Sequence, residues 1–118
     1  FRHIRDLRLP RRGGFRCLKH HLAEVAVSLE MARPLLHGAA LSVRDQSADA
    51  SRDISAAKVA CGDAAYKAAR VGLQVHGAIG YTMEHDLSLW LTKVRALLTA
   101  WGTPSEHRAR VVEALVAS

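Results

Sequence analysis

Seven histidines are the first residues of this chain to suggest metal or acid–base chemistry. His20 and His21 are adjacent, so on a helix their side chains diverge by about 100°. His76 and His85 flank a candidate loop, and no two histidines have the His-x-x-x-His spacing of a helical zinc site. We therefore expect no metal site. The sequence also carries no signature of a nucleophile–base–acid triad.

A glycine-containing segment, Gly77-Ala78-Ile79-Gly80, is the second candidate for chemistry. A short or absent side chain lets the backbone come close to a ligand, and such a junction could approach a phosphate. The same four residues also fit the C-cap of a helix, where glycine tolerates the left-handed backbone. Taken alone, the segment does not decide between these two interpretations.

The apolar pattern predicts four helices, which would position these residues. We expect them over residues 15–44, 51–76, 87–101 and 104–116. Apolar residues of the first helix step by four and three from Leu18 to Leu36, which marks one face. Pro34 should kink that helix, because it removes one backbone hydrogen bond. Gly77 and Gly80 should end the second helix, whose stripe of mostly small side chains allows close packing.

A start signal precedes the fourth helix. Thr103 is the expected N-cap, Pro104 takes the first helical position, and Glu106 completes a capping box. Gly102 should close the third helix. With no strand pattern in the sequence, the expected fold is all-α, an antiparallel arrangement of the four-helix-bundle type.

The composition is that of a globular domain. With 118 residues, 49% apolar and 24% charged, the chain is one domain at most. Cys17 and Cys61 do not make a disulfide framework, which favours reduced thiols and a cytoplasmic location. No apolar run approaches the roughly 18 residues of a membrane span. We expect no membrane partner.

The net charge of +6 is partly local, because six arginines fall within the first sixteen residues. A basic arm of this kind could hold nucleic acid or acidic lipid. However, no aromatic side chains are interleaved with the arginines for base stacking. We expect a solvated, irregular segment over residues 1–14, broken by Gly13 and Gly14, and no nucleic-acid partner.

Residues 74–86, Gln-Val-His-Gly-Ala-Ile-Gly-Tyr-Thr-Met-Glu-His-Asp, resemble the Q-x-H-G-G-x-G-[YF]-x-x-E-[HY] stretch of acyl-CoA dehydrogenases. Residues 15–24 are similar to the F-Q-x-L-K-H-x-L-A-[DE] helix start of that family, and residues 28–33 resemble its L-E-x-A-R continuation. The resemblance covers nearly the whole chain. It implies that residues 15–118 form the family's C-terminal helical domain. Residues 1–14 would then be a divergent remnant of the preceding helix and loop.

The resemblance implies an oxidoreductase that uses FAD to form the α,β double bond of a fatty acyl-CoA thioester. In the family, a carboxylate takes the α-proton and flavin N5 accepts the β-hydride. The C-terminal bundle covers part of the acyl and flavin pocket, contacts the FAD of a neighbouring subunit, and forms the core of a dimer of dimers. The implied partners are acyl-CoA and other subunits, either copies of the chain or related proteins.

Six residues match family positions that contact FAD. Two of them face phosphate or ribose, two form the glycine pair, and two lie near the adenine or adenosine: Arg5, Gln74, Gly77, Ala78, Phe15 and Thr103. Ala78 replaces the second glycine of the pair. Leu7 stands where the family has Gln or Thr, and it cannot donate a side-chain hydrogen bond. Both departures should weaken FAD binding.

Trp101 is the largest departure from the family. Many members carry the catalytic carboxylate directly before the Gly-Thr pair, and tryptophan cannot abstract a proton. Other members place that carboxylate on an earlier helix, which would precede Phe1. We therefore assign no catalytic residue and expect the chain alone to be inactive, as a fragment of the enzyme. Trp101 should end the apolar face of the third helix, under cover. The alternative is a non-catalytic helical module that pairs with complete subunits.

Overall fold

The structure, a computed structural model, describes the backbone of residues 12–79 and 84–117 and the side chains of residues 19–76 and 86–117. Four helices make up nearly all of these ranges: α1 (Arg12–Arg44), α2 (Ala50–Ile79), α3 (Glu84–Thr99) and α4 (Pro104–Ala117). No strand occurs among the described residues. The expected all-α fold is confirmed.

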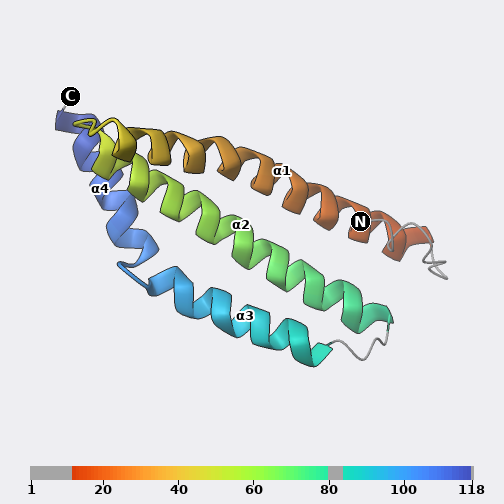
Figure 1. The fold of residues 1–118 in the computed structure, drawn as a ribbon. Coiled ribbons are helices and arrows are strands. Elements are labelled where there is room, and N and C mark those ends of the chain that lie inside the picture. The colour runs from red at the N-terminus through yellow and green to blue at the C-terminus, as the bar shows by residue number, and fades with distance from the viewer. Residues whose placement is uncertain (1–11, 80–83, 118) are drawn as a thin grey trace.

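Helix α2 lies at the centre of the fold and packs against each of the other three helices (Figure 1). α1 and α2 form a long antiparallel hairpin, α3 runs back beside α2, and α4 crosses the end of α2 near the α1–α2 turn. The molecule is elongated, with extents of 54 × 24 × 23 Å. The arrangement is therefore more open than a closed bundle, because the main contacts all involve one central helix.

Small side chains form the interface between α1 and α2. The buried apolar residues follow a seven-residue step on each helix, with Val25, Ala32 and Ala39 on α1 and Ala57, Ala64 and Val71 on α2. Such a step places successive side chains on one seam between paired helices. The predicted stripes are correct at these positions except for Ala39, which lies beyond the predicted stripe of the first helix. Val75 completes the buried set near the C-terminal end of α2.

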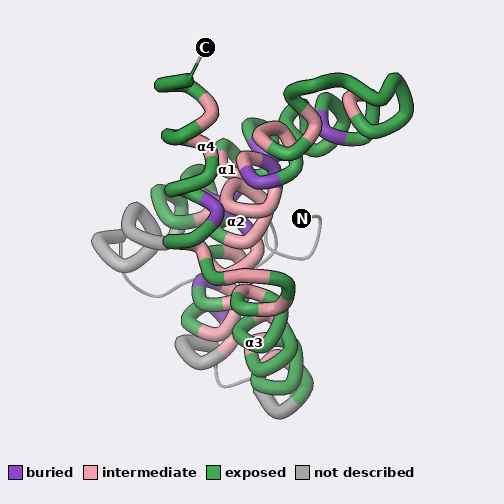
Figure 2. The backbone as a smooth tube through the Cα atoms, turned by 90° about the vertical axis from the view of Figure 1, so that its left-hand side faces the viewer, coloured by how far each residue is buried: buried purple, intermediate pink, exposed green. Residues whose placement is uncertain are grey.

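Two large apolar residues of the predicted α1 stripe are exposed. Leu29 and Leu36 are 41% and 53% exposed. They lie beside the seam, and no described element covers that side of α1. The expectation that the whole stripe forms core is wrong for these residues. Figure 2 shows the consequence, since buried positions are few and exposed or intermediate ones dominate each helix.

Helix boundaries differ from expectation at three glycines. α1 begins at Arg12, so Gly13 and Gly14 lie inside the helix instead of breaking it. α2 continues to Ile79, so Gly77 lies in its last turn, while Gly80 is outside the described residues. A glycine costs only about 1 kcal/mol inside a helix, and the neighbouring residues outweigh that cost. α1 also runs past Pro34 as one element.

Polar contacts hold the hairpin turn between α1 and α2. Ser42 Oγ donates a hydrogen bond to the Asp53 carboxylate, and Arg52 donates two more at 3.1 Å. These hydrogen bonds lower the pKa of Asp53 below its ordinary value, the Ser42 bond most and Arg52 next. Asp49 directly precedes α2, whose first residue is Ala50.

The predicted capping box at the start of α4 is present. Thr103 N donates to Glu106 Oε2 at 2.8 Å, and Glu106 N donates to Thr103 Oγ1 at 3.2 Å. Pro104 is the first residue of α4. Each of two side chains therefore satisfies a backbone N–H that the helix itself leaves unpaired.

Among the described residues, no helix is both long enough and apolar enough to span a bilayer.

Candidate functional site

Gln74 lies exposed on α2 at the rim of a polar groove shared with α1. The groove has a volume of about 320 Å³, and it is lined by His21 and Glu24 of α1 and by Asp63, Tyr66, Lys67, Arg70, Val71 and Gln74 of α2. The guanidinium of Arg70 lies 5.7 Å from the centre of the Tyr66 ring. Amide, ammonium and guanidinium donors therefore converge here, together with two carboxylates.

Three further predicted cofactor residues fall at this end of the hairpin by their backbone position. Phe15 lies near the start of α1, and Gly77 and Ala78 lie in the last turn of α2. Because α1 and α2 are antiparallel, the start of one is beside the end of the other (Figure 1). The side chains of these three residues are outside the described set, and Arg5 lies outside it altogether.

Thr103 lies at the other end of α2. It belongs to the turn before α4, and His107 in α4 contacts Ser55 near the start of α2. Ser55 and Gln74 are separated by about 28 Å, from 19 residues at a helical rise of about 1.5 Å. Within one chain, Thr103 and Gln74 therefore do not come together.

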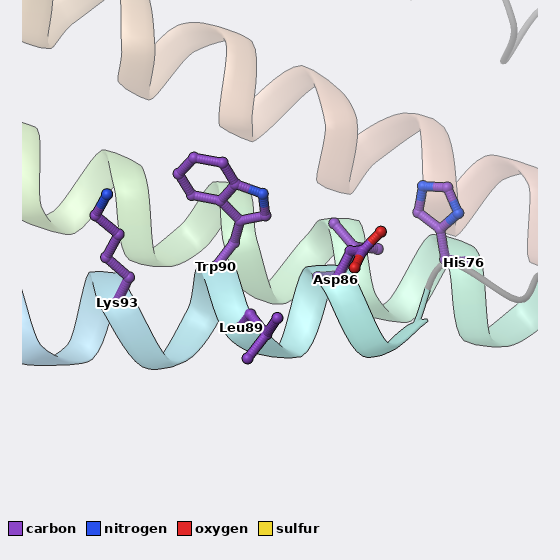
Figure 3. Close-up of a pocket in the computed structure, with 6 residues that line it drawn as sticks. His76, Asp86, Leu89, Trp90 and Lys93 are labelled. Carbon is purple, nitrogen blue, oxygen red and sulfur yellow. The ribbon is translucent and has the colours of Figure 1, made fainter.

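A second hollow, of about 440 Å³, lies between the end of α2 and the start of α3 (Figure 3). It is lined by His76, Asp86, Leu87, Leu89, Trp90 and Lys93. Trp90 and Lys93 lie side by side on α3, with Lys93 Nζ 5.4 Å from the centre of the indole. His76 belongs to the stretch of residues 74–86 on which the family resemblance rests. In the structure, residues of α3 form the other side of this hollow.

Trp101 does not occupy the place expected for it. α3 ends at Thr99, and Trp101 has a left-handed backbone with φ of 59° and an 85% exposed side chain. Gly102 follows with φ of 116°. These two left-handed residues form the turn after α3, and the indole lies exposed at that turn. The expectation of a covered Trp101 on the α3 face is wrong for this chain by itself.

A buried polar cluster next to Trp101 was not found by sequence reasoning. Ser55 is fully buried and His107 is 4% exposed. His107 Nδ1 lies 3.1 Å from Ser55 Oγ, and His107 Nε2 lies 3.1 Å from the Trp101 carbonyl oxygen. Arg110 Nη1 donates to Ser55 Oγ at 3.3 Å. The cluster therefore connects α2, α4 and the turn between α3 and α4.

The hydrogen-bond partners assign the protons of this cluster. The Trp101 carbonyl can only accept, so Nε2 of His107 carries a proton. Ser55 Oγ accepts from Arg110 and forms a hydrogen bond with Nδ1 of the same imidazole. A serine beside a histidine base is the arrangement of a nucleophile. Here both are buried, so no substrate can reach them, and their role is to hold structure.

One pattern in the sequence could have indicated this cluster. Pro104, His107, Val111 and Ala114 step by three, four and three, and all are buried or half-buried. This spacing defines the face of α4 that meets α2. His107 is the polar member of that face, and a polar side chain there needs a partner on α2.

Other candidate chemistry is limited. The described residues contain no group of three or more histidine, cysteine, aspartate or glutamate side chains arranged for a metal ion. Cys61 is a free, half-buried cysteine on α2. The candidate ligand sites near the end of α2 are the polar groove at Gln74 and the hollow between α2 and α3. A further hollow of about 530 Å³, with a mostly apolar lining, lies between α2 and α4.

The sequence and the fold correspond to a known class of domain. Residues 5–116 match the family described as acyl-CoA dehydrogenase, C-terminal domain. This match covers almost the entire chain, and that domain is all-α, as observed here. The chain belongs to the acyl-CoA dehydrogenase family and corresponds to its C-terminal helical domain.

Curated relatives agree with this family. The chain is 30% identical over 99 residues to acyl-CoA dehydrogenase IpdE2 of Mycobacterium tuberculosis, which covers 84% of this chain and 29% of that protein. It is 31% identical over 102 residues to 3-sulfinopropanoyl-CoA desulfinase of Paraburkholderia xenovorans, with coverages of 86% and 26%. Glutaryl-CoA dehydrogenase of Desulfococcus multivorans is 32% identical over 76 residues, with coverages of 64% and 20%. The chain spans less than a third of the length of these relatives. No solved structure matches it.

Proposed function

We propose that this chain serves as the C-terminal helical part of an FAD-dependent acyl-CoA dehydrogenase, which introduces an α,β double bond into an acyl-CoA thioester. The observation that carries this proposal is the family match over residues 5–116. Two of the relatives are named as dehydrogenases of acyl-CoA or glutaryl-CoA. Because the chain spans less than a third of their length, the activity is proposed for a larger protein or assembly that contains it.

The residues at the α2 end fit an outer contact with FAD. Gln74 is exposed, and His21, Lys67 and Arg70 line the same groove. Amide and cationic donors suit the ribose and phosphate oxygens of a dinucleotide. Bound there, the flavin would supply the hydride acceptor for the reaction. Gly77 and Ala78 lie in the adjoining last turn of α2. We include this turn, Arg5 and Phe15 among the proposed contacts with FAD.

Thr103 fits a separate contact. Its hydroxyl accepts from Glu106 N, and it keeps its own proton to donate to a ligand oxygen. Thr103 lies in the turn next to His107, which contacts Ser55, and Ser55 lies about 28 Å from Gln74 along α2. Thr103 and Gln74 of one chain would therefore contact different parts of an assembly. This separation favours a cofactor site built from more than one subunit, in which the groove at Gln74 faces a neighbour.

The chain itself brings no base to position 101. An indole cannot take the α-proton, so the carboxylate of the reaction would come from elsewhere in the protein or from a partner. The described residues would then contribute to binding FAD and to covering the acyl pocket, and not to proton transfer. Trp101, exposed at a turn, would fill space near the acyl chain in the assembled protein.

A second candidate is a non-catalytic helical module that pairs with complete acyl-CoA dehydrogenase subunits. The observation that favours it is the open apolar surface. Large apolar side chains on α1, α3 and α4 are more than half exposed, among them Met31, Trp90 and Val116. Such surface is typical of a face that another subunit covers. Tryptophan at position 101 is consistent with a subunit that does not itself abstract the α-proton.

The test uses the product of the complete open reading frame that contains this sequence. We expect the purified protein to carry flavin, and its absorbance to bleach when acyl-CoA is added without an electron acceptor. Bound flavin without bleaching, restored by co-expression of a complete dehydrogenase subunit, would favour the assembly module. A protein that neither binds flavin nor associates with such a subunit would contradict both.

A further inference from the structure

We infer that His107 is a positioning residue for position 101. It fixes the Trp101–Gly102 turn onto α2 through a relay that runs from the Trp101 carbonyl through the imidazole to Ser55. The inference rests on the proposed function for its importance, because position 101 directly precedes the Gly-Thr pair where many family members carry the catalytic carboxylate. The relay itself rests only on the structure.

The first support is that the turn has a conformation that needs an external restraint. Trp101 has φ of 59°, and the left-handed region costs a residue with a side chain roughly 1 kcal/mol or more. Its indole is 85% exposed, so packing of that side chain against this chain does not hold the turn. A residue in such a conformation persists where its surroundings determine it.

The second support is that three contacts converge on this turn, and His107 makes the central one. Lys58 of α2 donates to the Leu97 carbonyl before the turn. The capping box of Thr103 and Glu106 closes the turn on its far side. Between them, His107 Nε2 lies 3.1 Å from the Trp101 carbonyl oxygen.

The third support is steric. A Cβ built on Gly102 would lie 3.0 Å from His107 Nε2, which is closer than an ordinary van der Waals contact. Gly102 also has φ of 116°, a conformation in which only glycine is unstrained. The glycine is therefore required both by the backbone and by the imidazole packed against it.

The fourth support is the connection to α2. His107 Nδ1 is hydrogen-bonded to Ser55 Oγ, which is fully buried and accepts from Arg110. A buried hydroxyl with both partners in place holds the ring in one orientation. The relay thereby holds position 101 at a fixed place relative to the central helix α2. The distance between residue 101 and a ligand bound against α2 then depends on these hydrogen bonds and not on the mobility of a surface turn.

The direct test is local hydrogen exchange in the full 118-residue chain. His107→Leu removes both hydrogen bonds and keeps the apolar bulk. Exchange at the Thr103 and Glu106 amides should rise by roughly tenfold, the effect of about one lost hydrogen bond. Exchange at the Val71 amide in the α2 core should change by less than about twofold. Glu113→Gln, on the exposed side of α4, is the control and should change none of these.

Rescue separates positioning from general stabilisation. His107→Gln keeps one donor and one acceptor on the side chain, so it should restore most of the protection that His107→Leu removes. Adding Ser55→Ala to His107→Leu should have little further effect on the turn, because both act through one relay. If circular dichroism shows His107→Leu to be unfolded, Ser55→Ala and His107→Gln are compared by the same exchange measurement. A Ser55→Ala variant with an unchanged turn would then overturn the inference.

Fluorescence gives a second readout at position 101 itself. The chain has two tryptophans, so Trp90→Phe leaves Trp101 as the sole tryptophan, whose emission is excited selectively at wavelengths that tyrosine does not absorb. In that background, His107→Leu should lower the fluorescence anisotropy of Trp101, and His107→Gln should return it. Equal acceleration of exchange at all amides, or an unchanged Trp101 anisotropy, would overturn the inference.

The last arm keeps this inference separate from the proposed function. In the assembled protein, Trp101→Glu is combined with either His107→Gln or His107→Leu. With glutamine at 107, the glutamate should add acyl-CoA-dependent flavin bleaching beyond that of the Trp101 parent, and with leucine at 107 the added bleaching should be at least tenfold less. Absence of bleaching in the parent and in both variants, with the exchange result intact, would contradict the proposed function and leave the relay standing. Equal added bleaching in the two variants would overturn the positioning role.

Discussion

Gly62 of α2 faces Leu98 of α3 so closely that a Cβ on the glycine would lie 2.9 Å from Leu98 Cδ2. Side chains cannot approach at that distance without a shift. A side chain at position 62 would therefore have to displace the Leu98 side chain from its place between α2 and α3. Gly38 of α1 is a contrast, because a Cβ there would meet nothing within 4 Å.

Substitutions at these two glycines should act in opposite directions. Gly38→Ala should stabilise the chain by about 0.5–1 kcal/mol, since alanine is the better helix former and meets no neighbour. Gly62→Val should destabilise it by about 1–3 kcal/mol, because it overpacks the α2–α3 contact. Urea unfolding followed by circular dichroism measures both. A stabilised Gly62→Val variant would mean that α3 does not pack at this distance.

The contribution of Asp53 to stability should depend on pH. Its folded-state pKa is lowered below the ordinary value of 3.8, mainly by Ser42 and then by Arg52. A lowered pKa means that the charged form is favoured in the folded state, so the contribution is present above pH 3.8 and lost as the pH falls through the folded pKa.

Asp53→Asn measures this dependence, because asparagine still accepts a hydrogen bond but carries no charge. The difference in unfolding free energy between the two proteins should stay constant from neutral pH to about pH 5 and shrink below the ordinary carboxyl range. Asp45→Asn, whose carboxylate contacts only the adjacent Arg44 in an exposed pair, is the control. A difference that grows on acidification would contradict the sign of the shift.

The open apolar face of α1 should drive self-association of the isolated chain. Met31 and Leu36 are 67% and 53% exposed, and burying a side chain of this size contributes about 1.5–3 kcal/mol. Sedimentation should show dimers or larger species, and Met31→Lys should weaken association by roughly tenfold or more. Ser51→Lys adds the same charge on α2 and should have less effect. A monomer at all concentrations, with intact helix content, would contradict this account.

How far the sequence predicts this molecule depends on what each residue contacts. The seven-residue seam of Ala32 and Ala64 and the capping box at Thr103 follow from spacing alone, and both are present. Leu36 was misassigned because spacing identifies an apolar face but not whether another element covers it. Trp101 was misassigned because the turn that redirects it depends on His107, which contacts a residue 52 positions earlier. A contact at such a sequence separation is invisible to local pattern.

The candidate site shows the same division. The segment that begins at Gln74 is recognisable by its residues, and its position at the end of α2 follows from helix length. The lining of the groove around Gln74 could not be predicted from the sequence, because part of it, including His21, comes from α1. Which side chains of the two helices meet there depends on the register of the hairpin, and the Ser42–Asp53 contact helps to fix it.

The flavin content of the assembled protein tests the central claim most directly. Gln74→Ala should weaken the affinity for flavin by roughly tenfold, the effect of removing about one polar contact to a charged group. Less flavin should then remain with the protein after gel filtration. Ser51→Ala, an exposed position at the opposite end of α2, should leave it unchanged. Ala78→Gly should raise retention, because it restores the second glycine of the family's pair. Equal flavin in the parent protein and in Gln74→Ala would contradict the account, since the groove at the end of α2 would then not face the cofactor.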